Sequence, residues 1–192
     1  MENNNKKEKN MEPLIQVHST AIIDNGALIG IGTRIWHFCH IMGKTIIGDN
    51  CTLGQNVFVQ EGAIIGHNCK IQNNVSIYDG VVLENDVFVG PSAVFTNVRK
   101  PKINSPVDPD KYTKTIVHEG ASIGANATIV CGVEIGENAT IGAGSVITKS
   151  VPPGVTVVGN PAGILVRDIT GIAFVISFEE YFIKKKKYER KK

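Results

Sequence analysis

Large hydrophobic residues recur along this chain with a period of six. They occupy thirteen consecutive repeat positions from 23 to 95 and six more from 117 to 147. A small or β-branched residue stands four positions after each of the first twelve. Six residues fit one short strand and one corner, so three repeats make a triangular coil and stacked coils make a parallel β-helix. The pattern therefore predicts an all-β fold with the large side chains inside the coil.

The repeat divides the chain into a β-helix and three other segments. The β-helix is expected to span residues 18–162, after a polar, disordered or irregular start over residues 1–17. Residues 99–114, rich in Pro, Lys and Asp, break the period and predict an inserted loop between two faces of the coil. A long loop in a compact solenoid often carries function. Residues 163–192 form a C-terminal tail, either a cap on the open last coil or an amphipathic surface helix with a basic end.

Composition and charge narrow the function classes. Aromatic residues make up only 6% of the chain and it holds 20 glycines, as expected for short strands and tight turns. The formal net charge is +2, but residues 184–192 hold seven basic side chains and one acidic one, which leaves 13 basic and 17 acidic side chains elsewhere. A mildly acidic body argues against general nucleic-acid binding. Membrane attachment through the basic tail is the weaker interpretation of the lysine run.

The sequence also favours a reduced, cytoplasmic protein. Its first residues contain no apolar stretch typical of a secretory signal, and no apolar run reaches the roughly 18 residues of a membrane span. The four cysteines lack CxxC spacing, so a zinc or redox motif is not expected. Three of them, Cys39, Cys51 and Cys69, fall in the small position of the repeat, which predicts buried packing rather than catalysis.

Alignment of the repeats in steps of 18 stacks the corners of successive coils. Two corners carry Asx and Gly residues, which is ordinary turn chemistry. The third corner carries Gln55 and Asn56 on one coil and Asn73 and Asn74 on the next, after His37 on the coil before them. A ladder of amides that stabilises the stack is one interpretation. The other is a binding site, because this stack is larger and more polar than turns require.

The repeats "IGDNCT", "IGHNCK", "IGANAT" and "IGENAT" resemble those of the hexapeptide-repeat acyltransferases. The resemblance implies a left-handed β-helix, an exception to the usual crossover rule, whose inserted loop reaches a neighbouring subunit and walls the active site. Longer stretches, among them "RIWHFCHI", "CKIQNNVSIYDGV", "GPSAVFTNV" and "VGNPA", look like the acetyl-CoA-dependent N-acetyltransferases of nucleotide-linked 3-amino sugars. That likeness implies a homotrimer that acetylates the 3-amino group of a UDP- or dTDP-linked amino sugar for cell-surface polysaccharide biosynthesis.

Acetyl transfer to an amine suits carboxamide side chains. It needs a neutral amine, a positioned thioester and a stabilised oxyanion, whereas a strong base is unnecessary when the departing thiolate takes the proton. Amides accept or donate hydrogen bonds without carrying charge. We therefore expect Asn74 to orient the amine or the thioester, with Asn73 and Gln55 beside it. Asn56 is a further substrate-binding candidate, and the resemblance places the sugar near Tyr78, Asp79, Glu84 and Asn97.

Two stretches are the candidates for binding acetyl-CoA, "SIGANATI" and "VGNPAGILVR". Small residues let a pantetheine arm lie close to the backbone. A basic side chain, Lys149 or Arg167, is suited to meet the phosphates. The small residues among the cofactor-binding candidates, together with those of the terminal motif, are Gly124, Ala125, Gly142, Gly159, Asn160 and Pro161. No metal is expected.

Three alternatives stay open. An O-acetyltransferase of the same fold would use a histidine as general base, and His37 and His67 are the candidates for that role. A γ-type carbonic anhydrase would share the fold and bind zinc through three histidines, but the chain lacks the H-x4-H pair that such a site needs. A non-catalytic scaffold would use the repeats for assembly alone and would not bind acetyl-CoA.

Overall fold

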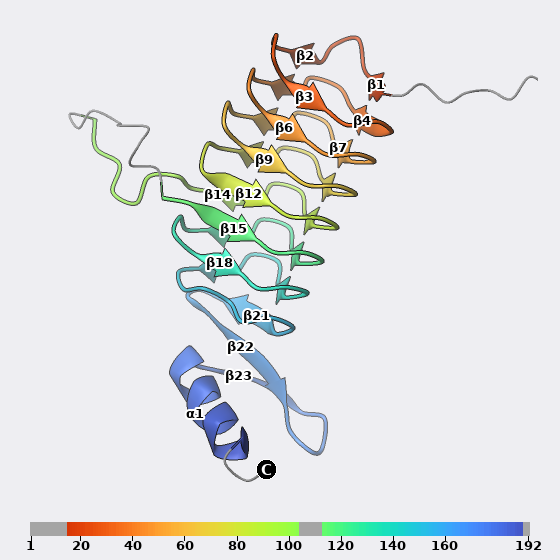
Figure 1. Ribbon diagram of the computed structural model, residues 1–192. Helices are drawn as coiled ribbons and strands as arrows, with labels where there is room; N and C mark the ends of the chain where they lie inside the picture. Colours follow the sequence, from red (N-terminus) through yellow and green to blue (C-terminus); the bar gives the residue numbers. More distant parts are fainter. Residues whose placement is uncertain (1–14, 104–112, 190–192) are drawn as a thin grey trace, which may run out of the picture.

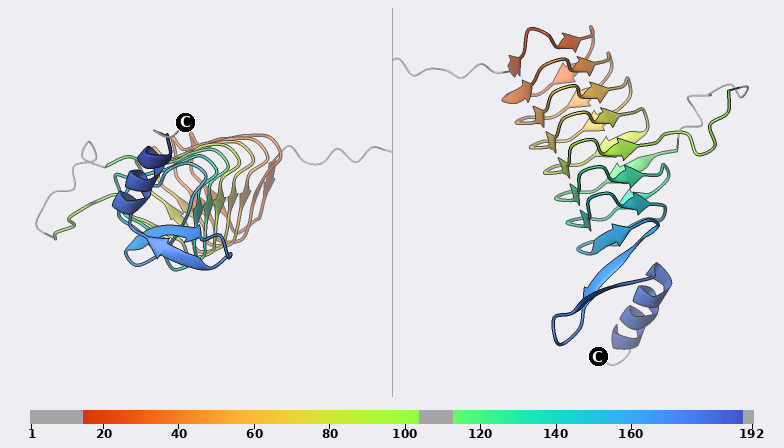
Figure 2. Two further views of the ribbon diagram at one scale, coloured as in Figure 1. Left: turned by 90° about the horizontal axis from the view of Figure 1, so that it is seen from below. Right: turned by 180° about the vertical axis from the view of Figure 1, so that it is seen from behind.

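The computed structural model describes residues 15–103 and 113–189, whose strands stack into a solenoid (Figure 1). Successive strands lie in turn on three faces, each a sheet of parallel strands, so every third strand is a hydrogen-bonded neighbour. The coils lie behind one another when the solenoid is viewed from below (Figure 2). The parallel β-helix expected from the six-residue period is confirmed. Its left-handed sense stays an expectation from the family resemblance.

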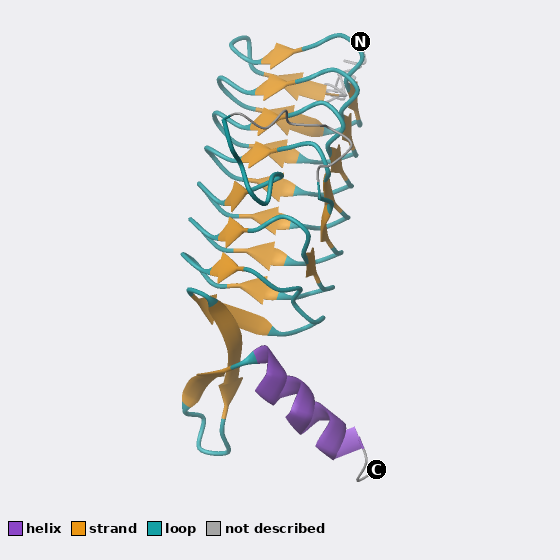
Figure 3. Cartoon of the chain, turned by 90° about the vertical axis from the view of Figure 1, so that its left-hand side faces the viewer, coloured by secondary structure: helices purple, strands orange, loops and turns teal. Residues whose placement is uncertain are grey.

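The strands are short, most of them two or three residues long, and they fall into faces A, B and C. Face A contains β1 (Ile15–Val17), β4 (Thr33–Ile35), β7 (Thr52–Leu53), β10 (Lys70–Ile71), β13 (Phe88–Val89), β16 (Ser122–Ile123), β19 (Thr140–Ile141) and β21 (Thr156–Gly159). Face B contains β2 (Ile22–Ile23), β5 (His40–Ile41), β8 (Phe58–Val59), β11 (Ser76–Ile77), β14 (Val94–Phe95), β17 (Thr128–Ile129) and β20 (Val146–Ile147). Face C contains β3 (Leu28–Ile29), β6 (Ile46–Ile47), β9 (Ile64–Ile65), β12 (Val81–Leu83), β15 (Thr115–Val117) and β18 (Glu134–Ile135). The antiparallel strands β22 (Ala162–Arg167) and β23 (Ala173–Ile176) extend face A, and helix α1 (Phe178–Glu189) follows them (Figure 3).

The core is the column of large side chains inside the coil. Most neighbouring strands pair with a register of 18 residues, as Arg34 pairs with Thr52 and Thr52 with Lys70. All the large repeat positions from 35 to 147 are at most 2% exposed. The first strand starts at Ile15, three residues before the expected boundary, because Val17 extends the six-residue period by one more repeat.

A left-handed backbone conformation at the second residue of most turns lets the chain bend. Gly or Asn occupies most of these positions, since both tolerate a positive φ. The first turn residue can bond to the preceding coil. Asn73 Oδ1 accepts from Gln55 N at 2.9 Å, and Asn85 Oδ1 accepts from His67 N at 2.9 Å. Polar turn residues therefore hold neighbouring coils in register.

The residue before each turn distinguishes one corner from the other two. At two corners it is usually glycine, because a Cβ would strike the next coil; on Gly90 a Cβ would lie 2.6 Å from Ala125 N. At the corner between faces B and C it is never glycine in the described coils. Those positions carry Asp24, Met42, Gln60, Tyr78, Thr96, Val130 and Thr148.

The inserted segment leaves the corner between faces B and C after β14 and rejoins face C at β15 (Figure 1). We therefore name this corner the loop corner.

Polar atoms in the narrow interior are satisfied by the coil itself. The Sγ atoms of Cys39, Cys51 and Cys69 each lie 3.0 Å from the carbonyl oxygen 15 residues later. Thr33 Oγ1 donates in the same way to Gly48 O at 2.9 Å. Burial raises the pKa of the Cys39 thiol, which keeps it protonated. The buried packing predicted for these cysteines is confirmed.

The C-terminal segment covers the last coil. Strand β22 pairs antiparallel with β21, and β23 pairs antiparallel with β22. Ile164, Ile176 and Phe178 are at most 8% exposed and join the core. Lys149 of the last turn pairs with Glu179 of α1. The tail is thus a cap of two strands and a helix, and within the described ranges no helix is long and apolar enough to cross a membrane.

A histidine ties three successive coils of face C together. His118 Nδ1 lies 3.1 Å from Glu84 Oε1, and its Nε2 lies 3.2 Å from Glu134 Oε2. The hydrogen bond to Glu134 and the charge of Glu84 raise the pKa of His118 above its ordinary value of 6.5, against the opposing effect of desolvation. Both carboxylates favour the imidazolium, so this contact is strongest when His118 is protonated.

We predict that His118→Gln lowers the melting temperature more in acid than in alkali. Because the folded-state pKa is raised, the stabilisation is fully present below about pH 6.5 and is lost as the pH rises through the folded-state pKa. Thermal unfolding followed by circular dichroism across this range measures the difference from the wild type. Ser122→Ala on face A is the control, with the same small effect at every pH. A deficit of His118→Gln that grows with pH would contradict the ion-pair role.

We also predict that Gly90→Ala lowers the free energy of unfolding by about 1–3 kcal/mol, the usual cost of forcing a group into a packed interior. Thr148→Ala changes the equivalent position before the loop corner and is expected to stay within about 0.5 kcal/mol of the wild type. Urea unfolding of both variants gives the two values. Equal destabilisation would show that the next coil does not require glycine at this position.

Candidate functional site

The predicted site residues gather mainly at the corner between faces A and B. We name it the amide corner, and its turns are residues 37–38, 55–56, 73–74, 91–92, 125–126 and 143–144. The structure brings together there, in order from the first coil to the last, His37, Gln55, Asn56, Asn73, Asn74, Gly124, Ala125 and Gly142. The turn of residues 159–161 joins the C-terminal end of this corner, where Gly159 N donates to Ser145 Oγ at 3.1 Å.

Asn56 and Asn74 occupy adjacent coils and form an amide ladder. Asn56 Nδ2 donates to Asn74 Oδ1 at 3.1 Å, and the two residues have positive φ angles of 58° and 61°. Asn73 Oδ1 accepts from Gln55 N, the bond that another corner also uses. These three asparagines therefore serve as turn residues as well, so their polarity alone does not distinguish a binding site from a ladder that stabilises the stack.

The hydrogen bond between Asn56 and Asn74 also holds the two remaining polar atoms of these amides in a defined orientation. Both side chains are exposed, and their bond leaves Asn56 Oδ1 as an acceptor and Asn74 Nδ2 as a donor. Neither atom has another hydrogen-bond partner among the described residues. Adjacent coils are about 4.8 Å apart, so the two groups can contact neighbouring atoms of one ligand. The pair is suited to meet an amine hydrogen and a carbonyl oxygen together.

The coils on the C-terminal side of the ladder present a strip of small residues. A Cβ on Gly124 would lie 2.5 Å from Ala143 N, and a Cβ on Gly142 would lie 2.6 Å from Val158 Cγ1. Close packing between coils therefore explains both glycines. It also leaves this part of the corner without large side chains, so an extended ligand can approach the backbone.

The other predicted substrate residues lie at different corners. Tyr78, Asp79 and Asn97 are at the loop corner, on the opposite edge of face B. At about 3.3 Å per residue, Asp79 lies up to roughly 16 Å along face B from Asn74. Glu84 precedes the third corner, where it contacts His118 as described. A single chain therefore does not bring these four residues to the amide corner.

The two basic residues expected to meet the phosphates also lie elsewhere. Lys149 is at the loop corner and pairs with Glu179. Arg167 ends β22 at the far end from Gly159, and its Nη1 donates to Gly171 O at 3.1 Å. Both side chains are engaged within the cap, which spacing along the sequence does not reveal.

An aromatic column on face B connects the amide corner with the loop corner. The rings of His40 and Phe58 lie 5.7 Å apart between centroids, and those of Phe58 and Tyr78 lie 6.2 Å apart. His40 Nε2 also lies 3.1 Å from Asp24 Oδ2. Sequence reasoning missed His40 and Phe58 as a pair, although they share one outward position at a spacing of 18 residues.

The two candidate base histidines differ in position. His37 lies at the amide corner and stacks on His18, with ring centroids 3.5 Å apart. His67 lies at the third corner, where its Nδ1 accepts from Asp49 N at 3.0 Å and lies 3.3 Å from Asp49 Oδ2. Of this pair, only His37 is therefore near the amides.

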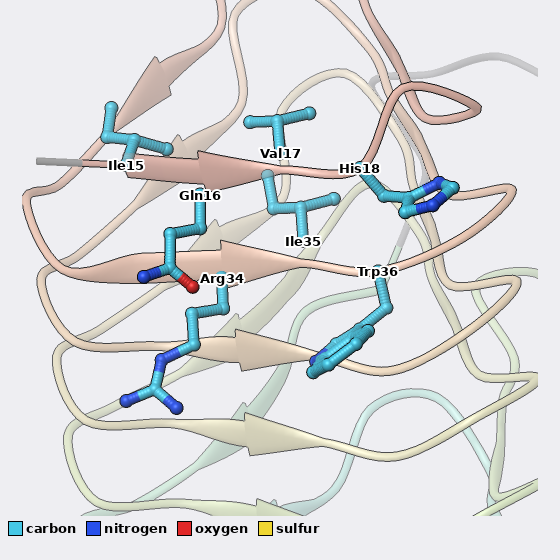
Figure 4. Close-up of a pocket in the computed structure, with 7 residues that line it drawn as sticks. All are labelled: Ile15, Gln16, Val17, His18, Arg34, Ile35 and Trp36. Atoms are coloured by element: carbon cyan, nitrogen blue, oxygen red, sulfur yellow. The ribbon is translucent and has the colours of Figure 1, made fainter. Parts of the chain in front are cut away.

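Two grooves meet at Trp36 beside the amide corner. One, with a volume of about 510 Å³, runs past Gly54 to Gln72 and Asn73. The other, of about 460 Å³, includes Trp36 and Arg34 (Figure 4). Sequence reasoning missed Trp36 and Gln72 as site residues. The sequence itself marks both residues as exceptions, because each stands before a turn at a position where other coils of this corner have glycine.

Comparison with known proteins identifies the repeats. The chain matches the family described as "Bacterial transferase hexapeptide (six repeats)" over residues 26–60, 62–97 and 114–149. Residues 44–79 also match the "Hexapeptide repeat of succinyl-transferase". The chain is 46% identical over 148 residues to a dTDP-3-amino-3,6-dideoxy-alpha-D-galactopyranose 3-N-acetyltransferase of Aneurinibacillus thermoaerophilus, covering 77% of this chain and 76% of that relative.

Solved structures share the solenoid. The acetyltransferase domain of PglB from Neisseria gonorrhoeae, in complex with acetyl coenzyme A, gives a TM-score of 0.55 at 23% identity, covering 81% of this chain and 60% of that chain. A hexapeptide-repeat acetyltransferase of Vibrio cholerae O1 biovar eltor, complexed with acetyl coenzyme A, gives 0.52 at 25% identity, covering 64% and 68%. The chain thus spans about 60% of the length of the PglB structure.

Three observations agree on the family. The six-residue period, the parallel coils and the matched repeats all describe the same architecture, and the matches cover more than half of the chain. The relative from Aneurinibacillus thermoaerophilus is similar over most of both sequences. This chain belongs to the bacterial hexapeptide-repeat transferases, the acyltransferase family that its repeats resemble.

Proposed function

We propose that this chain is an acetyl-CoA-dependent N-acetyltransferase that acts on the 3-amino group of a nucleotide-linked amino sugar. The ladder of Asn56 and Asn74 carries the proposal, because it presents an acceptor and a donor on adjacent coils without a charged base. The 46% identical relative is named for this reaction on a dTDP-linked sugar, which supports the substrate class. A UDP-linked amino sugar is the other member of the class to test.

The two amides of the ladder would contact different reactants. Asn56 Oδ1 accepts a hydrogen bond from the neutral amine and directs its lone pair toward the thioester carbon. Asn74 Nδ2 donates to the thioester oxygen, where negative charge develops. The carbon–nitrogen bond forms, the carbon–sulfur bond breaks, and the amine proton passes to the departing thiolate. Asn73 holds the turn that positions this pair.

Acetyl-CoA would lie along the small-residue strip. Gly124, Ala125, Gly142 and the turn of residues 159–161 all lie on the C-terminal side of Asn74 along one corner. A pantetheine arm on this strip delivers the thioester from the C-terminal side, and the amine approaches from the N-terminal side. The 25% identical Vibrio cholerae structure contains acetyl coenzyme A, in support of this cosubstrate. The proposed mechanism uses no metal.

The exposed surface of face C supports a homotrimer. Face C exposes an aliphatic column of Leu28, Ile46 and Ile64, which are 62%, 46% and 40% exposed. Contiguous exposed apolar surface of this kind marks protein interfaces. We expect subunits related by a three-fold axis to bury it.

We also propose a cytoplasmic location and a role in cell-surface polysaccharide biosynthesis. The four cysteines are free and buried, which suits a reducing compartment. Nucleotide-linked amino sugars are activated precursors, so the acetylation would precede transfer of the sugar into a polysaccharide.

Sugar O-acetylation is the second candidate function. His37 lies at the amide corner two coils before Asn73, and its stack with His18 holds the ring in place. A hydroxyl must lose its proton as it attacks, so this reaction needs a general base. A neutral amine keeps its proton until after the attack. The two candidate functions therefore differ in their dependence on His37.

We predict that Asn74→Gly lowers kcat for N-acetylation by roughly 100-fold, the effect of removing one oxyanion donor. Glycine retains the left-handed backbone of this turn and removes only the amide. Asn68→Gly, which changes a turn residue with a φ of 57° at the third corner, is the matched control and should keep the wild-type kcat. Thiol release from acetyl-CoA with a dTDP-linked 3-amino sugar measures both.

His37→Gln separates the two candidate functions in the same assay. N-acetylation should retain most of its kcat in this variant, because the mechanism needs no base. If His37→Gln loses roughly 100-fold or more while Asn74→Gly remains active, the general-base reaction is favoured and the ladder mechanism is wrong.

We predict that Ile46→Glu converts the protein from a trimer to smaller species, because a charge would be buried in the face C interface. Ile169→Glu, at a fully exposed isoleucine of the cap, is the matched control and should remain a trimer. Light scattering coupled to size-exclusion chromatography gives the mass of each. A trimeric Ile46→Glu variant would exclude face C as the interface.

A further inference from the structure

Two basic side chains form a cationic column on face A, next to the amide corner. Arg34, Thr52 and Lys70 pair in register on β4, β7 and β10, so their side chains point outward on successive coils. Arg34 and Lys70 are both exposed. Two strand spacings separate their backbones by about 9.6 Å. The two basic residues are far enough apart for each to contact a different anionic group.

Trp36 gives the same surface a flat apolar wall. It follows Arg34 by two residues, directly after β4, so both side chains project from the same side of the coil (Figure 4). The Trp36 side chain is 48% exposed. Gly54 occupies the equivalent position on the next coil and Gln72 the one after it, so the groove beside the indole has a glycine floor. An exposed indole beside an open floor suits the stacking of a planar ring.

The polar side chains that line the two grooves are neutral or basic, and Ile15, Val17 and Ile35 add apolar surface to the smaller groove. Gln55 and Gln72 line the larger groove together with Lys70, and Arg34 lines the smaller one. No carboxylate lines either groove among the residues that the structure describes. The chain outside its last nine residues has an excess of acidic side chains, so this basic surface departs from its surroundings. It is suited to a ligand that combines a planar ring with negative charge.

We propose that Trp36, Arg34 and Lys70 bind the nucleoside diphosphate of the sugar substrate, an inference that rests on the function proposed for the amide corner. The base stacks on Trp36 above Gly54. The diphosphate lies within reach of Arg34 and Lys70, which supply charge-assisted hydrogen bonds. The sugar then continues round the turn to the amide ladder.

The carboxamide of Gln72 supplies recognition of the base. A uracil or thymine ring presents a donor N–H between two acceptor oxygens, and a carboxamide offers both a donor and an acceptor to that edge. Gln72 is half-buried and stands before the turn that carries Asn73 and Asn74. The three consecutive amides thus have different roles: Gln72 contacts the base, Asn73 holds the turn and Asn74 contacts the reacting groups.

Tryptophan fluorescence tests this subsite directly, because Trp36 is the single tryptophan of the chain. We expect dTDP and UDP to quench the fluorescence saturably. Thymidine and inorganic pyrophosphate should each bind more weakly, since each makes only part of the contacts. Arg34→Gln and Lys70→Gln should each raise the Kd of dTDP and UDP about tenfold, the loss of one hydrogen bond to a charged group. Lys187→Gln, at an exposed lysine of α1, is the matched control and should bind as the wild type does.

Measurements of nucleotide binding and of turnover distinguish a failure of the nucleotide subsite from a failure of the proposed reaction. If neither nucleotide quenches the fluorescence, or if Arg34→Gln and Lys70→Gln bind both as tightly as the wild type, the subsite is wrong. If the nucleotides bind and the two variants weaken binding, but no amino sugar is acetylated, the subsite stands and the proposed reaction fails. In an active enzyme, Arg34→Gln should raise the KM of the nucleotide sugar and retain kcat. A variant that changes the oligomeric mass instead would assign this surface to subunit contact and overturn the proposal.

Discussion

The hydrogen bonding of each coil to the next, with a register of 18 residues, is the constraint on which the rest of this structure depends. Trp36 N bonds to Leu53 O at 3.0 Å and Gln72 N bonds to Val89 O at 2.9 Å, and the same pattern continues along all three faces. Because this register holds everywhere except across the inserted segment and at the last coil, residues 18 apart in the sequence become neighbours in space. Any site on this fold is therefore assembled as a column along a face or a corner.

This constraint explains why most of the fold could be predicted from the sequence. The period of six marks strands and corners at short range, and the 18-residue alignment places Asn56 next to Asn74 without any knowledge of the structure. The cap could not be predicted in the same way, because residues 163–192 carry no repeat and their two strands depend on pairing with β21. For the same reason, the sequence does not reveal that Glu179 of the cap pairs with Lys149 or that Arg167 bonds within the cap.

The site was less predictable than the fold because turn chemistry and ligand chemistry use the same residue types. Asn74 meets the need of a left-handed turn, and its outward donor becomes apparent only when the bond from Asn56 is seen. Trp36 and Gln72 are easier to recognise, because they replace the glycine that usually precedes a turn at this corner. Glycine before a turn is a packing requirement at this corner, so a large side chain there is a departure that the coil must accommodate. Such departures point to functional residues more directly than polar turns do.

The central claim is that the amide corner transfers an acetyl group from acetyl-CoA to a nucleotide-linked 3-amino sugar. Thiol release by the wild-type enzyme, measured with acetyl-CoA and a panel of UDP- and dTDP-linked 3-amino sugars, tests it most directly. We expect thiol release and N-acetylation in equal amounts with at least one amino sugar of the panel, and neither with the matching 3-hydroxy sugars. Acetylation of the 3-hydroxy sugars, or no turnover with any amino sugar, would contradict it.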